Sequence, residues 1–424
     1  MSLPGGRYLF RSLALLLPAL LLAGCPTDVD DPVTPPLPAN AIVIGMIQPQ
    51  ASGPSLEKEL AARLAIQEIN AAGGVNGRPL ALQIAYDGNN NAVLGVQAAQ
   101  QLVDSGVVAI IGANASRVTL PVAEQVTIPA GVALISPGST SPLVSQLVDN
   151  DTVWRIPPSD ALQGRLLAEK VWDEGHNTVA VFSLDEPYGQ GLAGAFRDRF
   201  LALGGSIHAE AVAPSSRESG FSTEIDALYA GGTPSVLMLF TFAVPTVNLL
   251  REIVTAKGSL PMLYGVDGNM TTDTLNNAPS QAAGMRGSTP AAASNSPEFQ
   301  RFLDAYVGAT GFVPGSNTEN AYDAVYLVAL ALAAAGSNER ADVVAQLRSV
   351  SGPDGAAAVK VGPGDFAAAL AAIAAGDDID YEGASGPVDF DAQGDPSAAT
   401  YLYQEIRLVA GVLQLVTLET IPYP

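Results

Sequence analysis

The sequence predicts an α/β fold of two lobes, each a parallel-rich sheet flanked by helices, and three observations support this. Short, continuously apolar segments alternate with helical patterns, as in βαβ units whose sheets are covered on both faces. This series occurs twice, from Ala41 to about Ser136 and again from Thr178 to about Gly265. The length of 424 residues, with 48% apolar and 15% charged residues, is sufficient for two globular lobes with ordinary cores.

Apolar segments of the first series predict strands at 41–47, 80–86, 107–112 and 131–136, and the patterns between them predict helices at 56–70, 92–106 and 117–126. The second series predicts strands at 178–184, 206–212, 235–240 and 261–266, and helices at 161–175, 192–203, 221–231 and 244–258. Between the two series, residues 152–160 carry paired prolines, which indicates a crossover.

A third, helix-rich part follows, with predicted helices at 296–310, 319–336, 340–350 and 366–376. Its alanine-rich helices are composed of strong helix formers, and we expect them to serve packing. The chain ends with two strand-like segments, at 401–409 and 412–418.

The N-terminus is typical of a secretory signal. Arg7 and Arg11 precede the apolar run Leu13–Leu22, which is short for a membrane-spanning helix, and small residues follow. The four residues up to Cys25, LAGC, resemble a bacterial lipobox, which predicts cleavage after residue 24 and lipid modification of Cys25. The alternative is an uncleaved anchor with an incidental cysteine.

Cys25 is the only cysteine of the chain, so neither an intramolecular disulfide nor a catalytic thiolate is expected in the folded part. Residues 25–40 are rich in proline and acid, which predicts an extended tether. No later segment is apolar over a sufficient length to cross a membrane. We therefore expect a body held at a membrane only through its N-terminal lipid.

The net charge is −22, and removal of the signal with its two arginines lowers it to −24. Nucleic-acid binding requires clustered Lys and Arg, so this balance argues against a nucleic-acid partner. We interpret the excess of acids as a solvated, mutually repulsive surface, and we expect a monomer.

Several segments, in this order along the chain, resemble the type I periplasmic binding proteins, and more closely the leucine/isoleucine/valine-binding proteins of ABC importers. They are EINAAGGVNGR (68–78), IIGANAS (110–116), ISPGSTSP (135–142), PYGQGLA (187–193) and YEGASGPVDFDAQGD (381–395). The resemblance extends over nearly all of the chain after Ala41. It implies two lobes joined by three crossovers, with a ligand held in the cleft between them.

The resemblance also implies the division of the chain. We predict a signal peptide at 1–24, a tether at 25–40, a first lobe of 41–156 plus 289–395, and a second lobe of 157–288 plus 396–424. The crossovers are expected near 155–158, 286–289 and 395–399.

In the first lobe, Ser116 lies between a predicted strand and a predicted helix. Its hydroxyl, with backbone N–H groups at the helix start, can receive a carboxylate. The resemblance implies this role, and a plain helix cap is the alternative. The next strand ends at Gly138, Ser139 and Thr140. The resemblance implies that Thr140 contacts both carboxylate and ammonium and that Gly138 offers its carbonyl to the ammonium; ordinary turn chemistry is the alternative.

In the second lobe, Asp267 follows a predicted strand, where the branched-chain binders have a Glu for the ligand ammonium. A buried carboxylate needs a cationic partner, so an acid here indicates an amine-bearing ligand, unless it is a plain Asp-Gly turn. The resemblance implies that Phe242 faces the ligand, although a core aromatic fits as well, and that Tyr188 covers the ligand.

One loop departs from the family. The segment SGPSLEKEL (52–60) has no aromatic where the family stacks one on the ligand. The residues that would surround the ligand's side chain are therefore not predicted, and neither leucine nor valine is assigned as the ligand. Gln48 and Ser52 are further candidates for the cleft wall.

An enzyme is the remaining alternative. Gly189, Gly191 and Gly194 form a G-x-G-x-x-G, but residues 184–188 separate it from the preceding strand, unlike a dinucleotide loop. His176 and His208 are the only histidines and lack metal-site spacing, and neither a G-x-S-x-G nor a P-loop occurs. We expect no enzyme, no cofactor and no metal.

The expected function is capture of a small amino acid or a related polar, amide-like solute and its delivery to the permease of an ABC importer. The expected location is the periplasmic side of a bacterial membrane. The alternative is a ligand sensor or regulatory lipoprotein with the same fold and no transport role.

Overall fold

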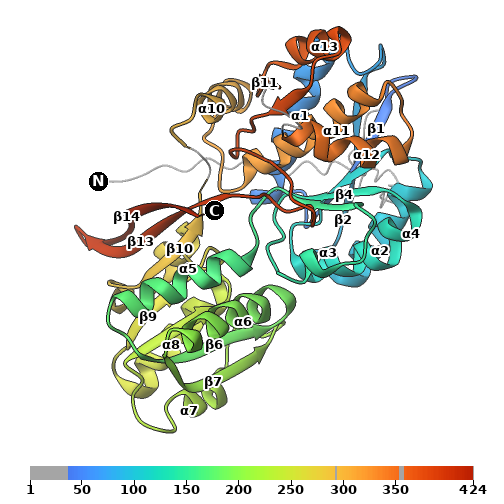
Figure 1. The fold of residues 1–424 in the computed structure, drawn as a ribbon. Coiled ribbons are helices and arrows are strands. Elements are labelled where there is room, and N and C mark those ends of the chain that lie inside the picture. The colour runs from blue at the N-terminus through green and yellow to red at the C-terminus, as the bar shows by residue number, and fades with distance from the viewer. Residues whose placement is uncertain (1–36, 292–293, 353–357, 424) are drawn as a thin grey trace, which may run out of the picture. The chain divides into compact units, whose positions relative to one another are not determined.

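The computed structural model describes residues 37–291, 294–352 and 358–423 (Figure 1). The predicted signal peptide, Cys25 and nearly all of the predicted tether lie outside these described residues.

Among the described residues, the first sheet has five parallel strands in the order β2-β1-β3-β4-β5. Their bounds are β1 (Ile42–Gln48), β2 (Leu80–Tyr86), β3 (Ala109–Ile111), β4 (Ala133–Ser136) and β5 (Val153–Arg155). The helical elements between them are α1 (Pro54–Ala71), α2 (Ala92–Asp104), α3 (Ser116–Val122), the π-helical turn η1 (Ala123–Thr127), α4 (Ile128–Ala130) and the 3₁₀ turn η2 (Val144–Gln146). The predicted strands and helices of the first series are confirmed, but β5 was expected only as a crossover.

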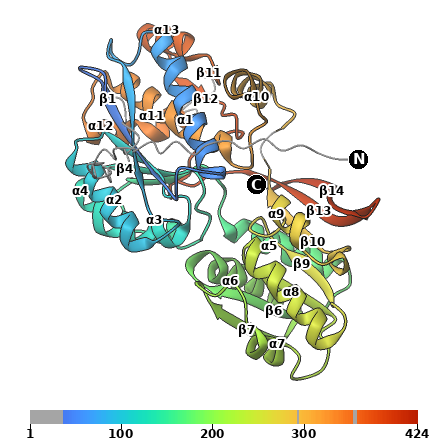
Figure 2. The same cartoon turned by 180° about the vertical axis from the view of Figure 1, so that it is seen from behind.

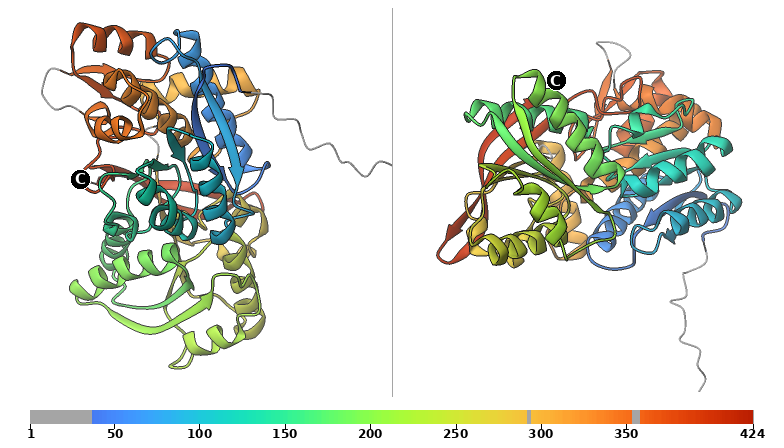
Figure 3. Two further views of the ribbon diagram at one scale, coloured as in Figure 1. Left: turned by 90° about the vertical axis from the view of Figure 1, so that its right-hand side faces the viewer. Right: turned by 90° about the horizontal axis from the view of Figure 1, so that it is seen from below.

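In the described part of the chain, the second sheet has seven strands in the order β14-β13-β10-β9-β8-β6-β7. They are β6 (Thr178–Asp185), β7 (Ser206–Pro214), β8 (Val236–Phe240), β9 (Met262–Gly265), β10 (Arg286–Pro290), β13 (Ala399–Val409) and β14 (Val412–Tyr423). Strands β6 to β10 run parallel, whereas β13 and β14 are antiparallel additions. The right-hand view of Figure 3 shows the red β13–β14 pair beside the green and yellow strands.

The helices of the second sheet are α5 (Asp160–Asp173), α6 (Pro187–Ala202), α7 (Ser222–Leu228), α8 (Ala243–Lys257) and α9 (Thr272–Asn277), with the 3₁₀ turn η3 (Ser280–Ala282) before β10. Side chains of α5 and α6 pack with Val181 and Met238 on one face, and those of α7 and α8 pack with Phe182 and Leu239 on the other. Figures 1 and 2 show these two helix layers from opposite sides. Consecutive strand residues thus point to opposite, equally buried faces, which explains why the strands are continuously apolar.

The third part packs on the first sheet. It contains α10 (Pro297–Thr310), α11 (Thr318–Ala335), α12 (Arg340–Ser351) and α13 (Phe366–Ala375), with the short parallel pair β11 (Val359–Val361) and β12 (Ile379–Tyr381). Helix α11 is buried over most of its length and shares a core with α1 and β1, so its alanines allow close packing. Among the described helices, none alone is long and apolar enough to span a bilayer; α11 and α12 meet that criterion only together, across a bend of 108°.

The connections between the two sheets are anchored by a buried ion pair. Arg155, at the end of β5 and without exposed surface, donates from Nε and Nη2 to the two carboxylate oxygens of Asp395, each at 2.6 Å. Its Nη1 donates to the carbonyl oxygen of Ser141 at 2.8 Å. The bidentate geometry therefore ties the chain that leaves the first sheet to the segment that leads into β13.

Candidate functional site

A cavity of about 260 Å³ is lined by residues that follow the carboxyl ends of strands of both sheets. Asn90, Ser116 and Gly138 follow strands of the first sheet, and Tyr188 and Asp267 follow strands of the second. Parallel strands bring the loops at their carboxyl ends together, which is where open α/β sheets bind ligands. The volume is just below the range of small-molecule pockets, which begins at about 300 Å³, so it suits one small solute.

The structure brings six of the seven predicted ligand residues to this one cavity: Ser116, Gly138, Thr140, Tyr188, Phe242 and Asp267. Ser139 is buried beside it and does not line it. The Ser139 hydroxyl is hydrogen-bonded to that of Thr119 at 2.7 Å, and its N–H donates to Ser136 Oγ at 2.9 Å. Ser139 therefore holds the turn that presents its two neighbours.

Ser116 is the first residue of α3, and Ala115 occupies the N-cap position. The plain helix-cap alternative is therefore wrong, because the serine hydroxyl makes no capping bond. Ser116 Oγ instead accepts a hydrogen bond from the N–H of Ser141 at 3.2 Å. Its own hydroxyl hydrogen has no acceptor among the described residues, so it is free to donate to an anion in the cavity.

Asp267 lies just after β9 and joins a small hydrogen-bonded group. Tyr188 donates its hydroxyl to Asp267 Oδ1 at 2.9 Å and accepts from the N–H of Gly268 at 3.0 Å. A Cβ on Gly268 would lie 2.7 Å from that hydroxyl, so glycine is required beside the aspartate. The ring of Tyr188 stacks on Phe242 with centroids 5.0 Å apart. Burial raises the pKa of Asp267, and the Tyr188 hydrogen bond partly opposes this rise.

A second carboxylate, Asp160, does not line the cavity but contacts the lining residue Thr140. It is fully buried at the start of α5, and its Oδ2 accepts from Thr140 Oγ1 at 2.9 Å. Its Oδ1 has no hydrogen-bond partner among the described residues. Burial and the nearby charge of Asp267 hold the pKa of Asp160 well above its usual value. A cation bound here would relieve the repulsion between the two carboxylates.

Asp160 is not predictable from the sequence, because a Ser-Asp pair at a helix start is ordinary capping chemistry and its partner lies on a distant segment. The two cations that line the cavity, Lys58 in α1 and Arg117 in α3, were not predicted either. Burial lowers the pKa of Lys58, against the charges of Glu319 and Glu57.

Two further candidates, Gln48 and Ser52, do not line the cavity. Gln48 is fully buried, and its Oε1 accepts from Asn114 Nδ2 at 2.8 Å, so it supports a lining residue. Ser52 is exposed.

Gly138 lies in a turn that contacts the backbone of Asn114. A Cβ on Gly138 would lie 2.8 Å from the carbonyl oxygen of Asn114, so only glycine fits at this position.

The G-x-G-x-x-G lies inside a helix. Helix α6 begins at Pro187, earlier than the predicted 192, and Glu186 caps it by accepting from the N–H of Gly189 at 2.8 Å. A Cβ on Gly189 would lie 2.7 Å from the carbonyl oxygen of Leu184, so this glycine lets the helix approach β6. The other two glycines do not repeat this role: a Cβ on Gly191 would meet Pro142, and Gly194 has open space around it.

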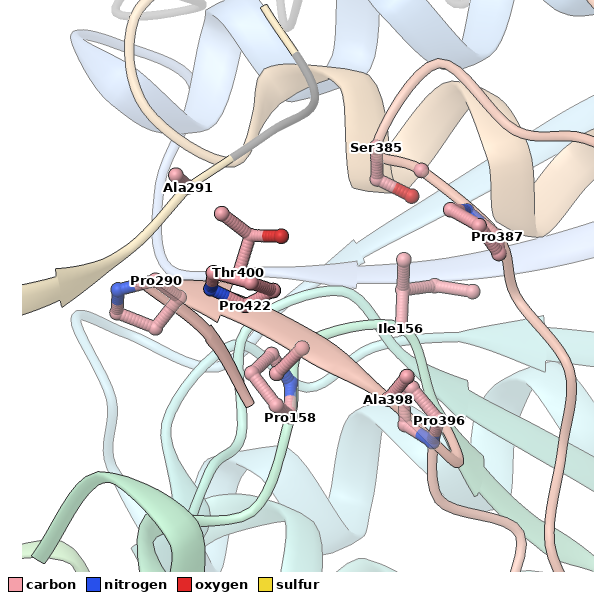
Figure 4. Close-up of a pocket in the computed structure, with 12 residues that line it drawn as sticks. Ile156, Pro158, Pro290, Ala291, Ser385, Pro387, Pro396, Ala398, Thr400 and Pro422 are labelled. Carbon is pink, nitrogen blue, oxygen red and sulfur yellow. The ribbon is translucent and has the colours of Figure 1, made fainter. Parts of the chain in front are cut away.

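A larger cavity of about 430 Å³ lies where the connections between the sheets run (Figure 4). Its wall includes Pro158, Pro290 and Pro396, while Ser385 and Thr400 contribute hydroxyls. No charged side chain of the described residues lines it, so it offers no ion pair to a charged solute. In the described ranges, no group of three or more His, Cys, Asp or Glu side chains is arranged to hold a metal ion.

Comparison with known proteins agrees with this arrangement. BasB, a substrate-binding protein of a chemotactic signal transduction system in Halobacterium salinarum, is 28% identical over 380 residues, covering 86% of this chain and 87% of that protein. The Leu/Ile/Val-binding protein BraC3 of Rhizobium johnstonii is 29% identical over 323 residues, covering 73% and 84%. The structure of an ABC transporter substrate-binding protein from Desulfitobacterium hafniense, in complex with Leu, is similar with a TM-score of 0.67 and 26% identity, covering 89% of this chain and 100% of that chain.

The family described as "Periplasmic binding protein" matches residues 41–407, from the start of the first strand into β13. Because this match extends over most of the chain and the architecture agrees with it, the chain belongs to the type I periplasmic binding proteins.

Proposed function

We propose that this protein captures an amino acid in the cavity between its two sheets and delivers it to an ABC importer. One observation carries the proposal: a serine whose hydroxyl hydrogen has no acceptor among the described residues and a partly buried carboxylate line the same small cavity. The α-carboxylate of the ligand would accept from the hydroxyl of Ser116, and the ammonium would lie against Asp267 and the carbonyl of Gly138. Relatives that are named as amino-acid-binding proteins support the same ligand class.

The ligand would be enclosed by a hinge motion of the two lobes, with Tyr188 and Phe242 forming the wall on the second lobe. A hydrogen bond between the segment after β4 and the start of α6 supports closure. Ser141, after β4, donates its hydroxyl to the carbonyl oxygen of Pro187 at the start of α6, at 2.8 Å. In this proposal the closed form is the one that docks on the permease.

We further propose that Cys25 carries the lipid and that the protein is held on the periplasmic side of a bacterial membrane. The support is the sequence alone: a basic start, a short apolar run and LAGC. Cells labelled with a tritiated fatty acid should incorporate label into the wild-type chain and not into Cys25→Ala. Equal labelling of both forms contradicts this anchor.

A second candidate is a sensor with the same fold, and the chemotactic relative favours it. The two roles differ in their partner. Co-purification with a permease and ATPase that are encoded beside this gene favours transport, whereas co-purification with a transmembrane receptor in the absence of any permease favours sensing.

Calorimetry against a panel of amino acids, urea, short amides and aromatic acids tests the binding proposal. At least one amino acid should bind with one molecule per chain. Absence of binding to every amino acid in the panel contradicts the proposed function.

A further inference from the structure

Lys58 and Arg117 add two positive charges to the cavity wall that a simple zwitterion does not use. The zwitterion is accommodated by Ser116 and Asp267. On the side of the first sheet, Ser55, Asn90 and Asn114 add polar groups to the wall, next to the apolar contributions of Pro49, Pro54 and Ala115. An apolar ligand side chain would strip water from these polar groups without replacing their hydrogen bonds, which is unfavourable.

Lys58 has no ion-pair or hydrogen-bond partner in the described part of the chain. Among the described residues, every other lysine and arginine forms an ion pair or donates a hydrogen bond, but Lys58 does neither. The chain has 42 acids against 20 lysines and arginines, so partners are abundant elsewhere. Arg117 uses only its Nε, which donates to the carbonyl oxygen of Asn90 at 3.0 Å.

The acids near Lys58, Glu57 and Glu319, act on it by their charge but form no ion pair with it among the described residues. Glu57 accepts from the N–H of Gly315 at 2.8 Å, and burial raises the pKa of Glu319 to about 7, so Glu319 is only partly ionised near neutral pH. Lys58 and Asp267 line the same cavity with opposite charges, so each can receive a ligand group of opposite sign.

We propose that Lys58, with Arg117, receives a second carboxylate, so that the preferred ligand is an α-amino acid with an acidic side chain. This inference rests on the proposed function and specifies its ligand class. Asp267 binds the ammonium, Ser116 the α-carboxylate, and the two cations the carboxylate of the side chain. The three ligand charges then match a cavity wall that carries two cations and one acid.

The experiment is titration calorimetry of the mature chain with L-glutamate, L-aspartate and L-leucine. At least one acidic amino acid should bind more than tenfold tighter than leucine. Lys58→Met keeps the length of the side chain and removes its charge. It should lower the affinity for acidic amino acids about ten- to a hundredfold and change the affinity for leucine by less than about threefold. Lys257→Met, at an exposed ion pair with Asp226, should change neither affinity.

The possible outcomes distinguish a failure of the acidic-ligand inference from a failure of the proposed function. Leucine binding tighter than both acidic amino acids overturns the acidic-ligand inference and leaves the proposed function standing. An equal loss of leucine and glutamate in Lys58→Met also overturns it, because Lys58 would then bind the α-carboxylate. Failure of every amino acid to bind contradicts the proposed function itself. A thermal melt of Lys58→Met shows whether the variant is folded.

Discussion

At the scale of single residues, two carboxylates that repel one another, Asp267 and Asp160, lie at the end of the cavity where we propose that the ligand ammonium binds. Asp160 is fully buried, and Asp267 is the acid that reaches the cavity. Both have a raised pKa for the same main reason, burial, and the charge of Asp267 adds to the rise at Asp160. Binding and stability therefore oppose each other at this site, as is common where a protein holds a charge for a ligand.

Asp267→Asn tests this opposition. The variant should bind amino acids at least tenfold more weakly, because the ammonium loses a charged partner. The ligand-free variant should melt at the same temperature or higher, because one of two repelling buried charges is gone. Calorimetry and thermal melting measure the two effects. Asp226→Asn, at an exposed ion pair, is the control, and unchanged affinity in Asp267→Asn contradicts the assignment.

Glu319 predicts a pH dependence of stability. Burial raises the pKa of Glu319 from 4.5 to about 7 in the folded protein, with Asp323 adding to the rise and Lys58 opposing it. Between these two pH values the folded state holds a proton that the unfolded chain has lost. Stability should therefore fall as pH rises from about 4.5 to about 7, by up to about 3 kcal/mol, and then level off.

Glu319→Gln removes this titration. Subtracting its urea-unfolding free energies from those of the wild type, between pH 4.5 and 8, should reveal the predicted fall. A difference that is independent of pH contradicts the raised pKa of Glu319.

At the scale of elements, the glycines of α6 have different neighbours. A Cβ on Gly191 would lie 2.6 Å from Pro142 Cδ, on the segment after β4, whereas Gly194 has open space around it. Close packing of α6 on β6 accounts for Gly189 but not for Gly191. Gly191 instead permits close contact between α6 and the loop that carries Ser141.

Gly191→Ala should therefore weaken amino-acid binding about tenfold by hindering this contact, with little change in the melting temperature of the ligand-free protein. Gly194→Ala is the matched control. It should leave affinity unchanged and stabilise the helix by about 1 kcal/mol. Equal affinities of the two variants would show that the contact at Pro142 has no part in ligand capture.

The ion pair of Arg155 and Asp395 joins β5 to the segment before β13. Arg155→Met leaves the carboxylate of Asp395 buried without its partner, and we expect a loss of about 3–5 kcal/mol in the free energy of unfolding. Arg197→Met breaks a half-exposed pair with Glu210 and should cost less than about 1 kcal/mol. Urea unfolding of both variants checks the ranking, and a reversed order contradicts it.

At the scale of the whole molecule, the sequence predicted most of the fold because its strands are buried on both faces and therefore continuously apolar. The predicted strands at 41–47 and 178–184, for example, are confirmed by β1 and β6. The short strands β5 and β10 were missed, because three to five residues next to prolines carry no periodic signal. Their pairing is decided by neighbouring strands, which a local pattern does not contain.

The candidate site was predictable only in part. Residues directly after strands, such as Ser116 and Asp267, could be found because the fold fixes where strand ends meet. Lys58 and Asp160 could not, because their proximity to the cavity depends on how helices pack. Tyr188, predicted as a mobile cover, is also part of a hydrophobic core and only 5% exposed. The substitution Tyr188→Ala would therefore disturb folding, whereas Tyr188→Phe removes only the hydroxyl and tests its role more directly.

The most direct test of the central claim is a crystal structure of the mature protein with the amino acid that calorimetry selects. We predict the ligand between the two sheets, with its ammonium within hydrogen-bonding distance of Asp267 and its α-carboxylate at the hydroxyl of Ser116. A ligand bound in another cavity, or one in this cavity with its ammonium turned away from Asp267, would contradict the account.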